Sequence, residues 1–187
     1  MKFVIMLLLS LTLYGADKYY EYGDLEERHD GVLIEVKTHS PANGIGKFYY
    51  ESGKLRGETP FKEGKREGLG KTYYESGELY GEMPFKNDII EGMRKSYYLS
   101  GKIQSETPFK NNKAEGIAKL YYESGKLQSE TPFVDNKAEG FAKLYEESGK
   151  IANEIEFKQS TAINGFQYDQ KGKKEPLSEA QLKEMGL

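Results

Sequence analysis

The chain repeats itself every 24 residues. A string close to Tyr-Tyr-Glu-Ser-Gly ends at five glycines with this spacing: Gly53, Gly77, Gly101, Gly125 and Gly149. Two further sets keep the same interval: Phe61, Phe85, Phe109, Phe133 and Phe157, and Gly44, Gly68, Gly92, Gly116 and Gly140. No insertion interrupts the period between the first and last of these residues. Such a pattern indicates one structural unit copied five times, each copy completing the burial of its neighbour.

The unit that begins at Gly116 predicts a β-hairpin. Two stretches rich in Tyr, Leu, Thr and Phe are separated by residues 123–126, and a second polar link covers residues 135–140. Aromatic runs bounded by glycine-containing turns are typical of strands. Each segment is too short, and carries too much Gly or Pro, for a helix. Although charged residues make up 30% of the chain, its 15 Tyr and 9 Phe argue against disorder.

The turn decides which side chains share a face of the hairpin. A three-residue Glu-Ser-Gly loop with a left-handed Gly125 predicts a bulged hairpin. One face would then carry Ile117, Tyr121, Leu127, Thr131 and Phe133, and the other Ala118, Leu120, Tyr122, Gln128 and Glu130. A two-residue Ser-Gly turn would instead place Lys119 opposite Glu130, but it would separate Tyr121 from Leu127. We favour the three-residue loop because the first face is apolar in the other copies as well.

A proline precedes the phenylalanine of four second strands: Pro60, Pro84, Pro108 and Pro132. Proline has no N–H to donate to a neighbouring strand. We therefore expect each of these strands to bend, bulge or end at its proline, so that the sheet curls along this line.

The first sixteen residues have the layout of a secretory signal peptide. One lysine, Lys2, precedes an apolar run over residues 3–13, and the small residues Gly15 and Ala16 follow. A membrane anchor is the alternative, but the run is shorter than the roughly 20 residues that a spanning helix needs. We expect the protein to be exported, to the periplasm or beyond.

The remaining chain divides into three parts. Residues 17–43 are a degenerate repeat or cap, in which residues 19–23 copy the Tyr-Tyr motif, and residues 44–157 hold the regular repeats. Residues 158–187 form a C-terminal cap with a last strand and turn. Ser178 followed by Gln181 is a capping-box arrangement, which predicts a short helix over residues 179–185.

The sequence contains no recognisable catalytic group. There is no cysteine, which excludes disulfides and thiolate metal sites. The two histidines, His29 and His39, lie ten residues apart in the irregular N-terminal region, where an exposed loop is preferred to a metal site. A net charge of −3 without a basic block argues against nucleic-acid binding. We expect no enzyme activity, no cofactor and no metal site.

Two recurring sets of side chains are candidates for contact with a partner. The first is a ladder of lysines (47, 71, 95, 119 and 143) and glutamates (58, 82, 106, 130 and 154), which either lines a binding groove or keeps a thin sheet soluble. The second is the later tyrosine of each motif, which either packs across strands or offers a rigid ring to protein or glycan. The candidate contact residues are Tyr50, Tyr74, Tyr98, Tyr122, Lys71, Lys95 and Lys119.

Residues 68–88 (GLGKTYYESGELYGEMPFKND) and 116–133 (GIAKLYYESGKLQSETPF) resemble the variant MORN repeat, named for the membrane occupation and recognition nexus. They resemble in particular the bacterial YwqK antitoxin-like proteins. The resemblance covers residues 44–157 and implies an elongated single-layer antiparallel sheet of hairpins. It also implies binding of proteins or acidic lipids, and the antitoxin label implies a toxin partner.

We therefore expect an exported, non-catalytic, all-β repeat scaffold that binds a protein partner through its curved surface. The alternatives are an antitoxin or immunity protein, and a binder of acidic lipid or cell-wall glycan. Because the terminal strands expose unpaired edges, self-association through them is also open.

Overall fold

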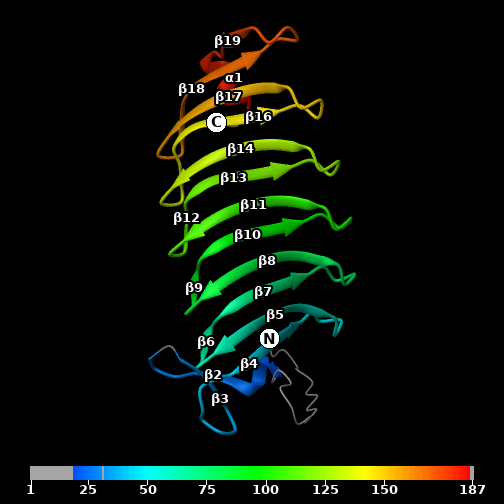
Figure 1. Cartoon of the computed structure of the whole chain (residues 1–187), viewed down its shortest axis with the longest axis vertical. Helices are drawn as coiled ribbons and strands as arrows, with labels where there is room; N and C mark the ends of the chain where they lie inside the picture. The colour runs from blue at the N-terminus through cyan, green and yellow to red at the C-terminus, as the bar shows by residue number, and fades with distance from the viewer. Residues whose placement is uncertain (1–18, 31, 186–187) are drawn as a thin grey trace. The chain divides into compact units, whose positions relative to one another are not determined.

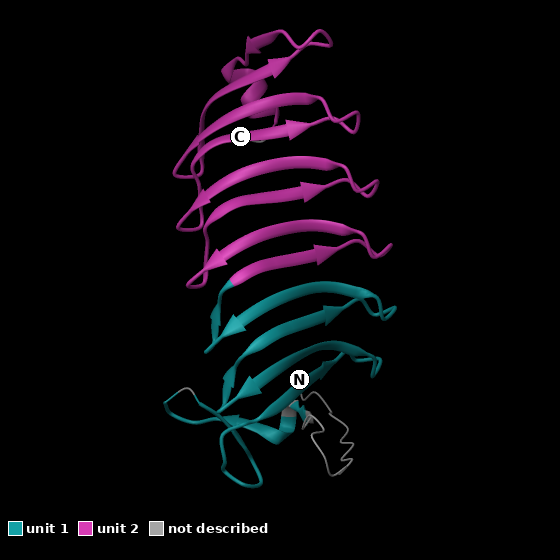
Figure 2. Ribbon diagram, viewed as in Figure 1, with its two compact units in different colours: residues 1–91 teal, residues 92–187 magenta. Residues whose placement is uncertain are grey.

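The computed structural model describes residues 19–30 and 32–185, so the predicted signal peptide lies outside the described residues. The chain forms two compact units, residues 1–91 and residues 92–187 (Figure 2). In both units the described residues are mostly β-strands joined as antiparallel hairpins. The predicted all-β fold of stacked hairpins is therefore confirmed. Within the described residues, no helix has the length and apolar character needed to cross a membrane.

Every repeat forms the same hairpin. Unit 1 contains β4 (Gly44–Tyr49) with β5 (Leu55–Lys62), and β7 (Gly68–Tyr73) with β8 (Leu79–Lys86). Unit 2 contains β10 (Gly92–Tyr97) with β11 (Ile103–Lys110), β13 (Gly116–Tyr121) with β14 (Leu127–Val134), and β16 (Gly140–Tyr145) with β17 (Ile151–Lys158). Within each unit, successive hairpins also pair with one another, as β5 does with β7, β11 with β13, and β14 with β16 (Figure 1). A single layer of strands results.

The turn inside each hairpin has the predicted three-residue form. In the hairpin of β13 and β14, Gly125 adopts a φ of 89°. Its N–H donates to the carbonyl of Tyr122 (2.8 Å), and the N–H of Tyr122 donates to the carbonyl of Lys126 (2.8 Å). A left-handed residue is required here, and glycine adopts that conformation without strain.

A second bulge follows this turn, and the sequence did not reveal it. Leu120 lies opposite Ser129, but the next residue, Tyr121, lies opposite Leu127. Gln128 is therefore an additional residue on the returning strand, without an opposite partner. The same shift occurs in the other four hairpins.

This bulge corrects the predicted distribution of side chains between the two faces. Lys119 lies opposite Glu130, the register that the two-residue turn would have given. Directly opposed residues in an antiparallel pair lie on the same face, so Glu130 joins Lys119 and Tyr121. The prediction that Thr131 and Phe133 share a face with Tyr121 is wrong, because the additional residue reverses the alternation beyond it.

The sheet consequently has two chemically different faces. We call one the lysine face; in unit 2 it carries Met93, Lys95, Tyr97, Glu106, Ile117, Lys119, Tyr121, Glu130, Phe141, Lys143, Tyr145 and Glu154. We call the other the phenylalanine face; in unit 2 it carries Arg94, Ser96, Ser105, Thr107, Phe109, Ala118, Leu120, Ser129, Thr131, Phe133, Ala142, Leu144, Ile155 and Phe157. Unit 1 has the same alternation, with Leu69, Lys71, Tyr73 and Glu82 on its lysine face and Gly46, Phe61, Gly70 and Phe85 on its phenylalanine face.

A two-residue turn connects one hairpin to the next. Between β14 and the short strand β15 (Lys137–Ala138), Asp135 and Asn136 adopt φ values of 50° and 67°, as a type I′ turn requires. The short strands β6 (Lys65–Arg66), β9 (Ile89–Ile90) and β12 (Lys113–Ala114) occupy the equivalent places. This turn is tighter than the polar link expected from the sequence.

The prolines lie inside strands and do not end them. β14 continues through Pro132, whose carbonyl accepts a hydrogen bond from the N–H of Glu139 (3.0 Å). The interruption falls in the following segment, at Glu139 between β15 and β16, and Gly140 at the start of β16 adopts a φ of 94° beside the proline ring. The expected irregularity therefore occurs in the strand that faces the proline.

The N-terminal segment copies the Tyr-Tyr motif but does not form the hairpin of the repeats. β1 (Tyr19–Glu21) pairs in parallel with β4, followed by the 3₁₀ turn η1 (Tyr22–Asp24). The strands β2 (Leu25–Glu27) and β3 (Leu33–Glu35) form a separate two-stranded sheet. Tyr20, Ala42 and Phe61 are buried together, so this segment covers the phenylalanine face at its end of unit 1.

The C-terminal segment covers the same face in unit 2. β18 (Thr161–Tyr168) and β19 (Lys174–Pro176) extend the sheet, and the predicted short helix is confirmed as α1 (Glu179–Glu184) (Figure 1). Ser178 Oγ accepts from the N–H of Gln181 (3.3 Å), and Gln181 Oε1 accepts from the N–H of Ser178 (2.9 Å). Leu182 packs over Gly165, beside Ile155, which is 1% exposed.

Candidate binding surface

Each candidate lysine lies on the lysine face of its own unit, opposite a glutamate of its own hairpin. Lys95 Nζ is 3.5 Å from Glu106 Oε1, and Lys119 Nζ is 3.7 Å from Glu130 Oε1. In unit 1, Lys71 lies opposite Glu82 in the same register. The positive charges of Lys95 and Lys119 are therefore balanced within the hairpin.

The same glutamates bind a tyrosine of the next hairpin. The hydroxyl of Tyr121 donates to Glu106 Oε2 at 2.9 Å. The equivalent bonds join Tyr145 to Glu130 (2.9 Å) and, in unit 1, Tyr73 to Glu58 (2.8 Å). In unit 2 the carboxylates of Glu106 and Glu130 thus each connect the lysine of their own hairpin with the first tyrosine of the next. The sequence pattern predicts these tyrosines on an apolar face and does not reveal the role of their hydroxyls.

The environment of these tyrosines keeps the hydroxyl protonated. Burial raises the pKa of Tyr121 and of Tyr73 to about 12, and the hydrogen bond to a glutamate acts in the same direction. Burial, with the bond to Glu130, also raises the pKa of Tyr145. A tyrosine beside a carboxylate must stay neutral to donate, so these bonds persist throughout the physiological pH range.

Three of the second tyrosines, which the sequence proposed as contact residues, bind the next hairpin as well. The hydroxyl of Tyr98 donates to the carbonyl of Tyr121 at 2.6 Å. The equivalent bonds are Tyr122 to Tyr145 and Tyr50 to Tyr73, both at 2.6 Å. The ring of Tyr74 meets that of Tyr80 edge-on, with the centroids 5.1 Å apart. Tyr50, Tyr98 and Tyr122 therefore hold successive hairpins together, and contact of any of these tyrosines with a partner stays a prediction.

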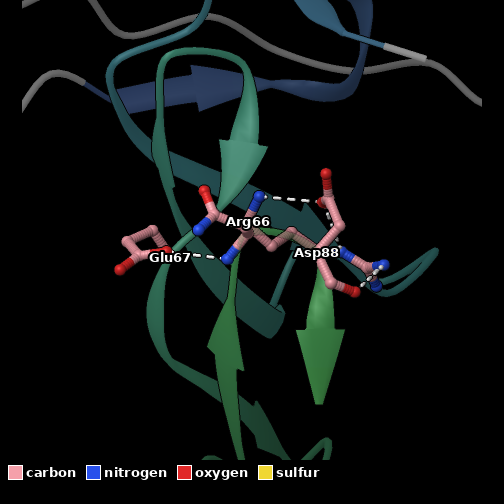
Figure 3. Close-up of polar contacts among 4 residues, drawn as sticks. Arg66, Glu67 and Asp88 are labelled. Atoms are coloured by element: carbon pink, nitrogen blue, oxygen red, sulfur yellow. Dashed lines mark hydrogen bonds and ion pairs between the residues drawn. The ribbon is translucent and has the colours of Figure 1, made fainter. Parts of the chain in front are cut away.

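The opposite edge of the sheet is held by side chains near the two-residue turns. In unit 1, the backbone N–H of Arg66 and its Nε both donate to Asp88 Oδ1, at 2.9 and 3.1 Å (Figure 3). Glu67 Oε2 accepts from the N–H of Asn87 at 2.7 Å. In unit 2, Asn136 Oδ1 accepts from the N–H of Ala114 (2.6 Å), and Glu115 Oε2 accepts from the N–H of Asp135 (3.1 Å).

These turn contacts could have been found from the sequence. Glu67, Glu91, Glu115 and Glu139 precede the first glycine of their repeats with the same 24-residue period, as the Asp and Asn pairs of the turns do. An acceptor side chain that recurs beside a turn is typical of backbone capping.

One recurring set of apolar side chains on the lysine face takes no part in the hydrogen bonds and ion pairs described above. Leu69 in unit 1 is 42% exposed. In unit 2, Met93 is 42% exposed, Ile117 52% and Phe141 46%, one from each hairpin and all at the same position. Rows of large exposed apolar side chains are typical of interaction surfaces. This row was not among the candidate contact residues taken from the sequence.

The histidines lie apart from these surfaces. His29 and His39 are both exposed, and His39 Nδ1 is 3.3 Å from Glu26 Oε1. Across residues 19–30 and 32–185, no three His, Asp or Glu side chains come together as metal ligands would.

Comparison with known families gives one match. The family model described as the MORN repeat variant matches residues 42–63, 66–87, 90–111, 114–135 and 139–159. Each matched segment contains one hairpin with its three-residue turn, and together the five cover more than half of the chain. No curated protein matches the sequence.

Proposed function

Because the chain belongs to the MORN repeat variant family, we propose that it is a non-catalytic scaffold that binds another protein through its lysine face. The observation that carries this proposal is the row of Met93, Ile117 and Phe141 in unit 2, each about half exposed. Covering the exposed half of such a side chain contributes about 1 kcal/mol. Three neighbouring hairpins therefore offer about 3 kcal/mol to a partner that lies across them.

The charges of this face favour a protein over an acidic membrane. Lys95 and Lys119 are balanced by Glu106 and Glu130, and the whole chain carries a net charge of −3. Attraction to acidic lipid depends on unbalanced basic residues, each worth about 1 kcal/mol near the surface. Sedimentation with acidic vesicles or with cell-wall sacculi tests the lipid and glycan alternatives.

The proposal includes export to the periplasm or beyond. It rests on the first sixteen residues, whose lysine, apolar run and terminal small residues follow the order of a signal peptide. Fractionation of cells, with N-terminal sequencing of the mature chain, tests export. A chain that begins at Met1 in the cytoplasmic fraction would contradict it.

Site-specific crosslinking in cells tests the binding surface. A photoreactive residue is placed at Ile117, on the lysine face, or at Ser124, which is exposed in the turn of the same hairpin. We expect one defined protein adduct from position 117 and none from position 124. A third probe at Tyr98 tests whether the tyrosine stripe touches the same partner. Equal capture from positions 117 and 124, or none from either, would contradict the proposal.

The resemblance of the repeats to the YwqK antitoxin-like proteins favours a second candidate function, which is neutralisation of one toxin. In that case the captured protein is a toxin encoded next to this gene, and deletion of this gene alone is lethal. Normal growth of the deletion strain would argue against this role.

A further inference from the structure

One repeat differs from the others on the phenylalanine face. The third residue of the first strand is Gly46, Gly70, Ala118 or Ala142 in four hairpins, and Arg94 in the fifth. The other four hairpins have glycine or alanine at this position, and the hairpin of β10 and β11 has a large, charged side chain.

The small residues make room for the phenylalanine of the paired strand. A Cβ at Gly46 would lie 2.8 Å from the ring of Phe61, and one at Gly70 would lie 3.0 Å from the ring of Phe85. An arginine cannot occupy the space that such a ring covers. Arg94 is accordingly exposed on the phenylalanine face of β10.

The guanidinium of Arg94 has no partner within the described part of the chain, in contrast to the other arginines. Arg28 pairs with Asp30, Arg66 pairs with Asp88, and Arg56 lies 5.7 Å from the ring centre of Tyr50. Arg94 makes no hydrogen bond, ion pair or ring contact with a described residue. Its planar donors are therefore available for a carboxylate, which they bind in a bidentate manner.

An exposed leucine lies near Arg94 on the same face. Leu120 is 46% exposed and lies opposite Ser105, which in turn lies opposite Ser96. Arg94 and Leu120 are separated by two strand spacings across the sheet and by two residues along the strand. Their Cα atoms therefore lie about 12 Å apart. A positive charge and an apolar side chain thus form one patch on β10–β13.

The chain itself shows what this face accepts. At the C-terminal end of unit 2, α1 places Leu182 on the phenylalanine face over Gly165, beside the fully buried Ile155. The same face continues along β10–β14, where Leu120 is not covered in this way. A helix that carries a leucine can therefore pack on this face, as α1 does at the C-terminal end of unit 2.

We propose that the phenylalanine face of β10–β14 binds an amphipathic helix of a partner protein, whose carboxylate pairs with Arg94 and whose leucine covers Leu120. Residues eight apart on one helix face are separated by about 12 Å, which matches the distance between Arg94 and Leu120. A polyanion is a poorer occupant, because the neighbouring Lys95 and Lys119 lie on the opposite face. This surface is distinct from the one in the proposed function, and neither depends on the other.

Two synthetic helical peptides test this proposal on the full chain. Each has 18 residues with leucine at every third or fourth position, and carries either Glu or Lys eight residues from a central leucine. By calorimetry we expect the Glu peptide to bind about tenfold more tightly, as one charge-assisted bond predicts. The NMR shifts of Arg94, Ser96 and Leu120 should move on binding.

Charge reversal at Arg94 provides the decisive comparison. Arg94→Glu should reverse the preference toward the Lys peptide, while Lys102→Glu, the same change in an exposed turn, should leave it unchanged. Arg94→Gly introduces the residue that two other repeats have at this position, so we expect the variant to fold. Loss of the preference for the Glu peptide in this variant is then due to the missing guanidinium. Equal binding of both peptides, no binding of either, or an equal effect of Lys102→Glu would overturn the proposal.

Discussion

Replacing Tyr121 by phenylalanine removes a single hydroxyl that connects two hairpins of unit 2. The hydroxyl donates to Glu106 Oε2 at 2.9 Å, and the side chain of Glu106 is 22% exposed. A hydrogen bond to a charged group contributes about 1.5–3 kcal/mol when fully buried. Because these groups are only partly shielded from water, we expect Tyr121→Phe to lower the free energy of unfolding by about 1–1.5 kcal/mol. For a chain of this size the melting temperature should fall by roughly 2–6 °C.

Urea denaturation followed by circular dichroism measures this loss. Tyr80→Phe is the matched control, since the ring of Tyr80 is 44% exposed and packs edge-on against Tyr74. It should change the free energy of unfolding by less than about 0.5 kcal/mol. A double-mutant cycle with Glu106→Gln should give a coupling energy above about 0.5 kcal/mol. An additive cycle, or equal losses in Tyr121→Phe and Tyr80→Phe, would refute the assignment.

The raised pKa of Tyr121, caused by burial and by the bond to Glu106, predicts a loss of stability at alkaline pH. The pKa of Tyr121 is raised to about 12, above its ordinary value of 10.0. A raised pKa stabilises the folded protein fully below pH 10, and this stabilisation is lost as the pH rises through 12. Unfolding measured between pH 9 and 12 should therefore weaken less steeply in Tyr121→Phe than in the wild type. Identical slopes would mean that the hydroxyl does not titrate with folding.

Three further substitutions test the turns and the C-terminal cap. Asn136→Ala removes the acceptor for the N–H of Ala114 at a φ of 67°, and should destabilise the protein by about 1–2 kcal/mol in urea; an unchanged midpoint would contradict the role of the turn. Gly125→Ala, at a φ of 89°, should cost about 1–2 kcal/mol in the same assay because no other residue tolerates this conformation as well; a loss below 0.5 kcal/mol would count against it. The hydrogen bond from Lys174 lowers the pKa of Glu154 below its ordinary value of 4.5, so the resulting stability is present above pH 4.5 and is lost as the pH falls through the lower, folded value. Glu154→Gln should therefore flatten the acid side of the melting-temperature curve between pH 2 and 6, and a curve parallel to the wild type would exclude this contribution.

The hairpin and its first turn were predictable because glycine at a fixed spacing has few explanations. Gly125 follows Ser124 in a motif that recurs without insertion, and a left-handed residue between two aromatic strands specifies a short turn. The second bulge was not predictable. The additional residue is Arg56, Tyr80, Gln104, Gln128 or Ala152 in the five hairpins, and no shared property marks this position.

Because the bulge residue is not predictable, the contacts of the candidate surface could not be derived from the sequence. Without the bulge, Glu130 falls on the face opposite Tyr121, and the bond between Tyr145 and Glu130 cannot be inferred. The partners lie 15 residues apart in different hairpins, so their meeting depends on the register of two successive strand pairs. An error of one residue in register transfers every later side chain to the other face. Charge ladders were therefore visible in the sequence, but their connections to tyrosine were not.

The residues that recur most strictly in this chain are explained by the stacking of its hairpins. Lys119, Glu130, Tyr121 and Tyr122 each bind within the hairpin or to its neighbour, and they leave few groups for a partner. The proposed contact with a partner must then depend on positions that stacking does not determine. The residue after the first glycine of each hairpin is such a position, because it varies among Ile, Leu, Met and Phe and the fold leaves Ile117 52% exposed. A large apolar side chain that recurs at a position where the fold leaves it exposed is what the proposed binding function requires.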